Sequence, residues 1–192
     1  MEILFVSEFK RKAIHFAALS IPIGYYFLPK RTALLILIPI VLISLAMDII
    51  RLKELPGSAF IKRLIGFMLR DHESSDLSGA SYILSGAALT ILLFAKPVAL
   101  AALGFIILGD IAAALVGRKY GRIKIGDKTL EGSLTFFGVC TLVALLVPDF
   151  SFVVGIMGAL IATIFEAMTL PLDDNLIVPV ISGLVMQILA AI

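Results

Sequence analysis

One stretch of the chain combines acids, bases and glycines in a pattern that could bind a polyphosphate. It runs from Gly109 to Ser133, and Asp110 lies near its start, inside an apolar segment. A carboxylate in a membrane-length apolar segment costs about 2.5 to 3.5 kcal/mol on insertion scales, so such an acid commonly faces a bundle interior and serves a function. Asp110 is therefore the first candidate catalytic residue.

Small residues recur every four positions beside this acid, at Gly109, Ala113 and Gly117. Residues with this spacing share one face of a helix, and small side chains there let a second helix approach closely. The pattern predicts that Asp110 faces protein and not lipid.

The segment after Asp110 is basic and rich in glycine. Its cations are Arg118, Lys119, Arg122, Lys124 and Lys128, and Glu131 follows them. Positive side chains with exposed backbone amides suit a polyphosphate, and carboxylates suit the Mg²⁺ that accompanies it. The alternative is an ordinary cytoplasmic loop, which explains the cations but not Glu131 at the start of a helix.

A second acidic group lies near the end of the chain, where Asp173, Asp174 and Asn175 follow Pro171. Adjacent carboxylates without a nearby cation suit a hard divalent metal ion. Alternatively, Asp174 or Asn175 caps the last helix. Glu166 precedes this group by about two helical turns, which favours metal or base chemistry.

The elements that must position these residues are membrane helices, because 60% of the 192 residues are hydrophobic and 16% are charged. Seven apolar runs could cross a bilayer as helices: 13–28, 32–50, 77–95, 98–116, 134–147, 150–170 and 176–192. The fifth run is short and the last one ends the sequence, so six spans are the alternative. The fold class is therefore all-α, a polytopic integral membrane protein with a single domain over 1–192.

The basic residues predict the orientation. Three precede the first run, five lie in the second loop and five in the fourth, whereas Lys30, Arg31 and Lys96 lie opposite. The bias of lysine and arginine toward the cytoplasm places the N-terminus and the candidate site on the cytoplasmic side. In the second loop, residues 59–70 have an apolar side and predict an interfacial amphipathic helix.

Other polar residues reach the same face. Lys12 and His15 share one side of the first span with Glu8, and Asp48 lies three residues from Arg51 at the end of the second. Each group could contribute to a site or simply pair within itself. The single Cys140 excludes a disulfide within the chain, and no feature indicates a nucleic acid partner.

An ordered set of motifs resembles the CTP-dependent lipid kinases, the family of dolichol kinase, phytol kinase and CTP-dependent diacylglycerol kinase. The motifs begin with Glu8-x-x-Arg11-Lys12-x-x-His15, Arg70-x-x-Glu73 and Gly79-Ala-Ser-Tyr82. They continue with Gly109-Asp110-x-x-Ala113-x-x-x-Gly117, Lys128-x-x-Glu131-Gly132-Ser133, and Glu166 before Asp173-Asp174-Asn175.

This resemblance implies a membrane enzyme that transfers a phosphoryl group from CTP to a lipid alcohol, with membrane lipid around it. Catalysis would rest on Asp110, Lys128, Glu166 and Asp174, with Glu166 or Asp174 as the base. The implied ligands of Mg²⁺ are Asp110, Glu131, Asp173 and Asp174. The implied residues around the nucleotide are Lys12, His15, Arg70, Arg118, Arg122, Lys124, Lys128, Gly132 and Ser133.

Alternatives stay open at this point. The alcohol could be a polyprenol, dolichol, phytol or diacylglycerol, and a homo-oligomer is possible. The Lys128-x-x-Glu131 arrangement also resembles that of the phosphatidate cytidylyltransferases, which share a preference for CTP but transfer a nucleotidyl group. A transporter is a third hypothesis, but a relay needs polar groups through the membrane thickness, and the outer halves of these spans are almost wholly apolar.

Overall fold

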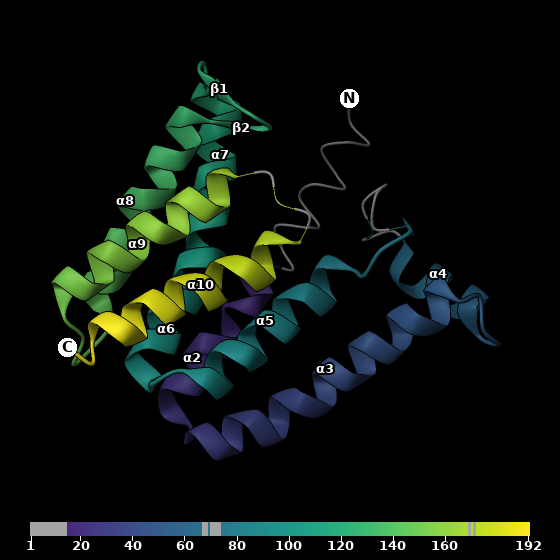
Figure 1. Cartoon of the computed structure of the whole chain (residues 1–192). Helices are drawn as coiled ribbons and strands as arrows, with labels where there is room; N and C mark the ends of the chain where they lie inside the picture. Colours follow the sequence, from purple (N-terminus) through teal and green to yellow (C-terminus); the bar gives the residue numbers. More distant parts are fainter. Residues whose placement is uncertain (1–14, 67–68, 70–73, 169, 171) are drawn as a thin grey trace.

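The computed structural model describes residues 15–66, 69, 74–168, 170 and 172–192. In this part the chain is predominantly helical, with one short two-stranded sheet, which confirms the all-α class (Figure 1). The elements are α2 (Ser20–Phe27), α3 (Lys30–Leu52), α4 (Ser58–Ile65), α5 (Gly79–Leu93), α6 (Lys96–Gly104), the π-helical segment η3 (Phe105–Gly109), α7 (Asp110–Tyr120), β1 (Lys124–Ile125), β2 (Lys128–Thr129), α8 (Leu130–Leu146), α9 (Phe152–Ala167) and α10 (Asp174–Leu189).

A continuous helix made of α6, η3 and α7 forms the centre of the bundle. Ala99, Phe105 and Ile107 in it are fully buried, because α2, α5, α8 and α10 pack around α6 and η3. The alanines of α6 keep these neighbours close. This central helix positions Asp110, which is its first residue after the π-helical segment.

The remaining helices form a layer beside this centre. Figure 1 shows α10 between α9 and α5, with α3 on the outer side of α5, in agreement with the packing of these pairs. Only 17% of the most apolar part of α3 is buried, and Leu35, Leu42 and Ile43 are exposed on it. An apolar surface of this extent is unfavourable in water, so lipid is the medium it suits.

Helices overlap the predicted spans, but their lengths differ from the expectation. In the described residues, Lys30–Leu52 and Lys96–Tyr120 are the two helices long and apolar enough to cross a membrane. The apolar helices α5, α8, α9 and α10 have 15 to 17 residues. At 1.5 Å per residue they extend about 22 to 26 Å, so the count of seven spans stays a prediction.

The bundle end formed by the starts of α3 and α6 is held by two reciprocal lysine contacts. Lys30 Nζ donates to the carbonyl of Phe94 at 3.2 Å, and Lys96 Nζ donates to that of Leu28 at 3.0 Å. These carbonyls end neighbouring helices and have no partner within them. Two of the three cations that the sequence analysis predicts on the outer side therefore cap helix ends.

A buried ion pair joins α3 to the start of α5. Arg51 Nη2 lies 3.0 Å from Asp48 Oδ1, and Asp48 Oδ2 accepts hydrogen bonds from the backbone N–H of Ser78 at 2.9 Å and from its hydroxyl at 2.8 Å. Arg51 Nη2 also donates to the carbonyl of Asp76 at 2.6 Å. This arrangement favours the reading in which Asp48 and Arg51 pair with each other.

The helix predicted within 59–70 is α4, which packs on α3. Ile61 is buried, whereas Phe60 and Leu64 are 69% and 51% exposed. These exposed apolar side chains suit the membrane interface. The position of α4 at that interface stays a prediction.

Candidate functional site

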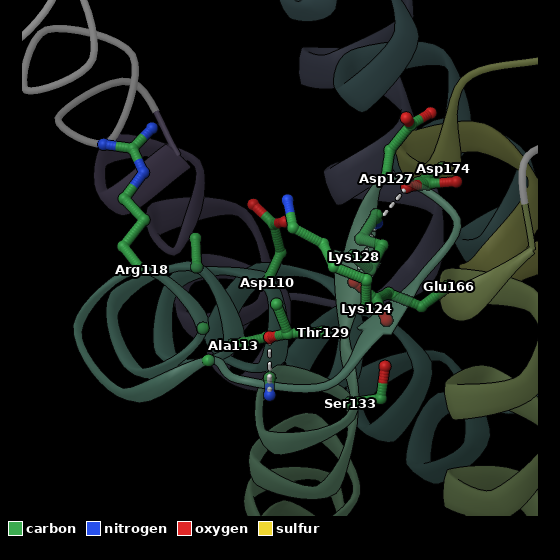
Figure 2. Close-up of a pocket in the computed structure, with 14 residues that line it drawn as sticks. Asp110, Ala113, Arg118, Lys124, Asp127, Lys128, Thr129, Ser133, Glu166 and Asp174 are labelled. Carbon is green, nitrogen blue, oxygen red and sulfur yellow. Dashed lines mark hydrogen bonds and ion pairs between the residues drawn. The ribbon is translucent and has the colours of Figure 1, made fainter.

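A cavity of about 550 Å³ lies where α7, the hairpin formed by β1 and β2, α8, α9 and α10 meet (Figure 2). Its lining combines acids, bases and small residues from all five elements: Asp110, Ala113, Ala114, Gly117, Arg118, Gly121, Lys124, Asp127, Lys128, Thr129, Gly132, Ser133, Glu166 and Asp174. Residues more than 60 positions apart in the sequence therefore share one site.

The cavity wall between α7 and α8 is built by glycines that allow the two helices to touch. A Cβ on Gly117 would lie 2.8 Å from Thr129 Oγ1, and one on Gly132 would lie 3.1 Å from the carbonyl oxygen of Ala113. A Cβ on Gly109 would lie 2.7 Å from the ring of Phe136. The close helix approach predicted from the small-residue spacing is confirmed.

The start of α8 is fixed by a side-chain cap. Thr129 Oγ1 accepts a hydrogen bond from the N–H of Gly132 at 3.2 Å, as an N-cap residue does. Because Thr129 is also the last residue of β2, this cap fixes the hairpin relative to α8. The neighbouring Lys128 is thereby held at the cavity.

Lys128 bridges two acids from different helices. Its Nζ lies 2.7 Å from Glu166 Oε1 on α9 and 2.8 Å from Asp174 Oδ2 at the start of α10. Burial alone would lower the pKa of Lys128, but the two carboxylates outweigh this effect and hold its pKa above the ordinary value. The ammonium group is therefore charged at neutral pH.

Asp110 lies on the α7 wall of the cavity. Its Oδ2 is 3.2 Å from Nδ1 of His15, which is buried. The structure therefore brings together two predicted site residues from motifs that are 95 positions apart in the sequence. The π-helical segment directly before Asp110 is a kind of helix distortion that is frequent at functional sites.

Two of the predicted metal ligands have other partners. Asp173 is the N-cap of α10, since its Oδ1 accepts hydrogen bonds from the N–H of Asn175 at 2.9 Å and from its side-chain amide at 2.6 Å. Glu131 Oε2 accepts from the N–H of Ile123 at 3.3 Å. Neither acid is among the residues that line the cavity.

The predicted nucleotide-binding residues other than His15, which lies beside Asp110, divide into three groups. Arg118, Lys124, Lys128, Gly132 and Ser133 line the cavity, and Figure 2 shows Arg118 on the far side of Asp110 from Lys128. Arg122 is exposed beside it and does not line it. Lys12 and Arg70 lie outside the described residues.

Sequence reasoning missed the hairpin and one acid on it. Lys124 pairs with Thr129 and Ile125 with Lys128 across two antiparallel strands. The turn between them is Gly126-Asp127, with φ +57° at the glycine. A glycine followed by aspartate is a known hairpin-turn signal, so the sequence did contain the information. As a result Asp127 lines the cavity.

The carboxylates of the cavity fit a Mg²⁺ ion that arrives with a nucleotide. Among the described residues, no three acid, histidine or cysteine side chains lie close enough together to form a complete metal site. Mg²⁺ commonly binds through one or two carboxylates together with substrate phosphates, so a complete protein cage is not required. Asp110 and Asp174 are cavity acids of the required kind.

Comparison with known proteins adds an independent observation. An uncharacterized protein of Rickettsia prowazekii is 34% identical over 90% of this chain and 89% of its own length. The CTP-dependent diacylglycerol kinase 1 of Schizosaccharomyces pombe is 28% identical over 95% of this chain and 93% of its own length. Dolichol kinase of Saccharomyces cerevisiae is 32% identical over 73% of this chain, which spans 27% of that longer protein.

No family model and no solved structure matches the chain. The relatives that carry a functional name are kinases of the family that the ordered motifs resemble. Cavity residues Asp110, Lys128, Glu166 and Asp174 belong to those motifs. The chain therefore belongs to the family of CTP-dependent lipid kinases.

Proposed function

We propose that this protein transfers the γ-phosphoryl group of CTP to the hydroxyl of a long-chain isoprenoid alcohol, such as a polyprenol, dolichol or phytol. The observation that carries the proposal is the bridge from Lys128 to Glu166 and Asp174 within an acid- and base-lined cavity. Phosphoryl transfer chiefly needs positioning of the reactants and neutralisation of charge, and the acids and bases of this cavity are suited to both tasks.

The cations would bind the triphosphate. Lys128, Lys124 and Arg118 line the cavity from two elements, and an ammonium or guanidinium group pairs well with phosphate oxygens. Backbone N–H groups near Gly132 add donors at the start of α8. Arg122, Lys12, His15 and Arg70 would complete the surroundings of the nucleotide and metal.

Asp110 and Asp174 would hold Mg²⁺, with Glu131 and Asp173 as further proposed ligands. When bound, this ion neutralises charge on the phosphates during transfer. In the reaction the alcohol O–H bond breaks and its proton passes to Glu166 or Asp174. A new oxygen–phosphorus bond forms, and the bond from the γ-phosphorus to the bridging oxygen breaks as CDP leaves with the electron pair.

The reaction would take place at the cytoplasmic face of a membrane. The sequence distribution of lysine and arginine supports this orientation, and CTP is a cytoplasmic nucleotide. The exposed apolar surface of α3 supports a position within lipid.

The full chain in lipid vesicles with Mg²⁺ tests the proposal when CTP carries its label in the γ position. We expect label to enter a lipid monophosphate with isoprenoid alcohols of several lengths. Parallel reactions with ATP, GTP and UTP test the donor. If label from α-labelled CTP enters lipid while γ label does not, the protein is a nucleotidyl transferase and the proposal is wrong.

Diacylglycerol is the second candidate substrate. The similarity to the diacylglycerol kinase of S. pombe covers nearly the full length of both proteins, which favours it. The same γ-labelled assay with diacylglycerol in place of the isoprenoid alcohol separates the two candidates. If label enters diacylglycerol and no isoprenoid alcohol, diacylglycerol is the substrate, and the proposed kinase chemistry is unchanged.

A further inference from the structure

Two buried polar atoms at the cavity have no hydrogen-bond partner among the described residues. They are Oε2 of Glu166 and Oγ of Ser133, and these residues are 2% and 7% exposed. Buried polar atoms in native proteins nearly always have partners, so unpaired ones at a cavity indicate that something else binds there. Both residues line the cavity described above.

The two atoms come from adjacent helices and complement each other chemically. Ser133 lies on α8 and Glu166 on α9, and these helices pack side by side. Figure 2 shows the Ser133 hydroxyl directed toward the Glu166 side chain. A carboxylate accepts hydrogen bonds, whereas a serine hydroxyl also donates one. A group that both donates and accepts would satisfy both atoms, and an alcohol hydroxyl is such a group.

The buried pair and the cavity cations differ in exposure. Lys124 and Arg118 are exposed, whereas Glu166 and Ser133 are buried. Lys128 lies between the two parts, because its ammonium group already binds the other oxygen of Glu166. A γ-phosphate held by Lys128 would therefore be next to whatever occupies the buried pair.

We propose that Glu166 and Ser133 form the binding site for the alcohol hydroxyl, and that Glu166 Oε2 accepts its proton. This inference rests on the proposed function and selects between the two candidate bases. Ser133 donates a hydrogen bond to the alcohol oxygen. The O–H proton moves to Glu166 as that oxygen bonds to the γ-phosphorus and CDP leaves.

Asp174 differs from Glu166 in its exposure and in its position. Its side chain is 32% exposed, compared with 3% for that of Glu166. It is the first residue of α10 and lines the cavity. We therefore assign Asp174 to the phosphate and Mg²⁺, and the buried Glu166 to the alcohol.

The test uses Glu166→Gln and Ser133→Ala in the full chain in lipid vesicles. The glutamine can still accept from Lys128 through Oε1, but it cannot take a proton at the second position. We expect kcat to fall about 100-fold or more for Glu166→Gln, as for loss of a general base. For Ser133→Ala we expect about a tenfold fall, as for loss of one hydrogen bond. The Kd for CTP should stay within about threefold of the original value.

Thr90→Val is the matched control. Thr90 is fully buried, its hydroxyl has no partner in the described structure, and it is not a cavity-lining residue. We expect this variant to keep its kcat, so that loss in Ser133→Ala reports the cavity and not the removal of any buried hydroxyl. Thermal unfolding of each variant checks the fold.

A second measurement works without turnover. A photoreactive long-chain alcohol with its diazirine beside the hydroxyl is crosslinked to the protein in the absence of CTP. We expect about fivefold less crosslinking for the Glu166→Gln/Ser133→Ala double variant and no change for Thr90→Val. If the protein transfers no γ label, the kinase proposal is overturned. Crosslinking that still depends on Glu166 and Ser133 would in that case support the alcohol site on its own.

The inference is overturned if Ser133→Ala and Glu166→Gln keep kcat in an active kinase. It is also overturned if CTP affinity falls in proportion to kcat, since the pair would then bind nucleotide. Equal crosslinking in the double variant and the original protein would indicate that ordered water alone occupies the pair.

Discussion

Lys128 Nζ lies 2.7 Å from Glu166 Oε1, so a residue on the hairpin is bonded to an almost completely buried acid on α9. The sequence separates the two residues by 38 positions. This contact joins two residues of the cavity lining and neutralises part of the buried negative charge.

Loss of the Lys128 charge should destabilise the protein through Glu166. Lys128→Met leaves a buried carboxylate without its cation, which typically costs about 3 kcal/mol or more. Adding Glu166→Gln removes that charge, so the double variant should unfold at a higher temperature than Lys128→Met alone. Thermal unfolding in detergent measures this coupling, and strictly additive effects would contradict it.

Asp110→Asn should abolish transfer of γ label to lipid while the fold is kept. The change preserves shape but removes the charge that we assign to metal binding, and it weakens the contact with His15. Asp149→Asn is the control, because Asp149 is an exposed loop acid away from the cavity. Full activity in Asp110→Asn would remove this residue from the mechanism.

Activity should require a divalent cation. Chelation with EDTA should reduce transfer to background, and added Mg²⁺ should restore it. Asp174→Asn should raise the Mg²⁺ concentration for half-maximal activity about tenfold or more, because a charged ligand is lost. An unchanged Mg²⁺ dependence in this variant would exclude Asp174 as a ligand.

Gly109→Ala should destabilise the contact between the central helix and α8. Its Cβ would meet the ring of Phe136 at 2.7 Å, and such overpacking costs about 1 to 3 kcal/mol. Gly138→Ala on α8 is the matched control, since nothing lies within 4 Å of its Cβ position. That change should be neutral or stabilising by up to about 1 kcal/mol. Equal unfolding temperatures for the two variants would contradict the close packing.

Arg51→Ala should lower stability strongly without a specific effect on the KM for CTP. It leaves Asp48, which is fully buried, without its cation, and breaking a buried pair costs about 3 to 5 kcal/mol. Lys62→Ala provides the comparison, because its pair with Glu54 is exposed on the surface, where solvent and salt screen it and it contributes little to stability. Similar losses for both variants would show that burial of Asp48 does not matter.

Much of the site could be predicted from local pattern. A lone acid in an apolar segment, small residues every four positions and a basic segment rich in glycine marked Asp110, Gly117 and Lys128. These signals arise from the cost of burying a charge and from the periodicity of a helix, and both can be recognised within a few residues of sequence.

The helix lengths and individual partners could not be predicted in the same way. An apolar run does not reveal where its helix ends, because caps such as Thr129 and Asp173 fix the ends through specific hydrogen bonds. The sequence equally allowed Asp174 or Asn175 to cap α10, and the structure places Asp173 there.

By itself the sequence determined that the chain is helical, suited to lipid, and equipped with acids and cations for phosphate chemistry, since composition and periodicity act locally. Tertiary structure alone decided that Lys128 reaches Glu166 and Asp174, that Glu131 and Asp173 lie off the cavity lining, and that Asp127 joins it. Those facts depend on how α7, the hairpin, α8, α9 and α10 pack together, and contacts between distant segments leave no periodic trace in one sequence.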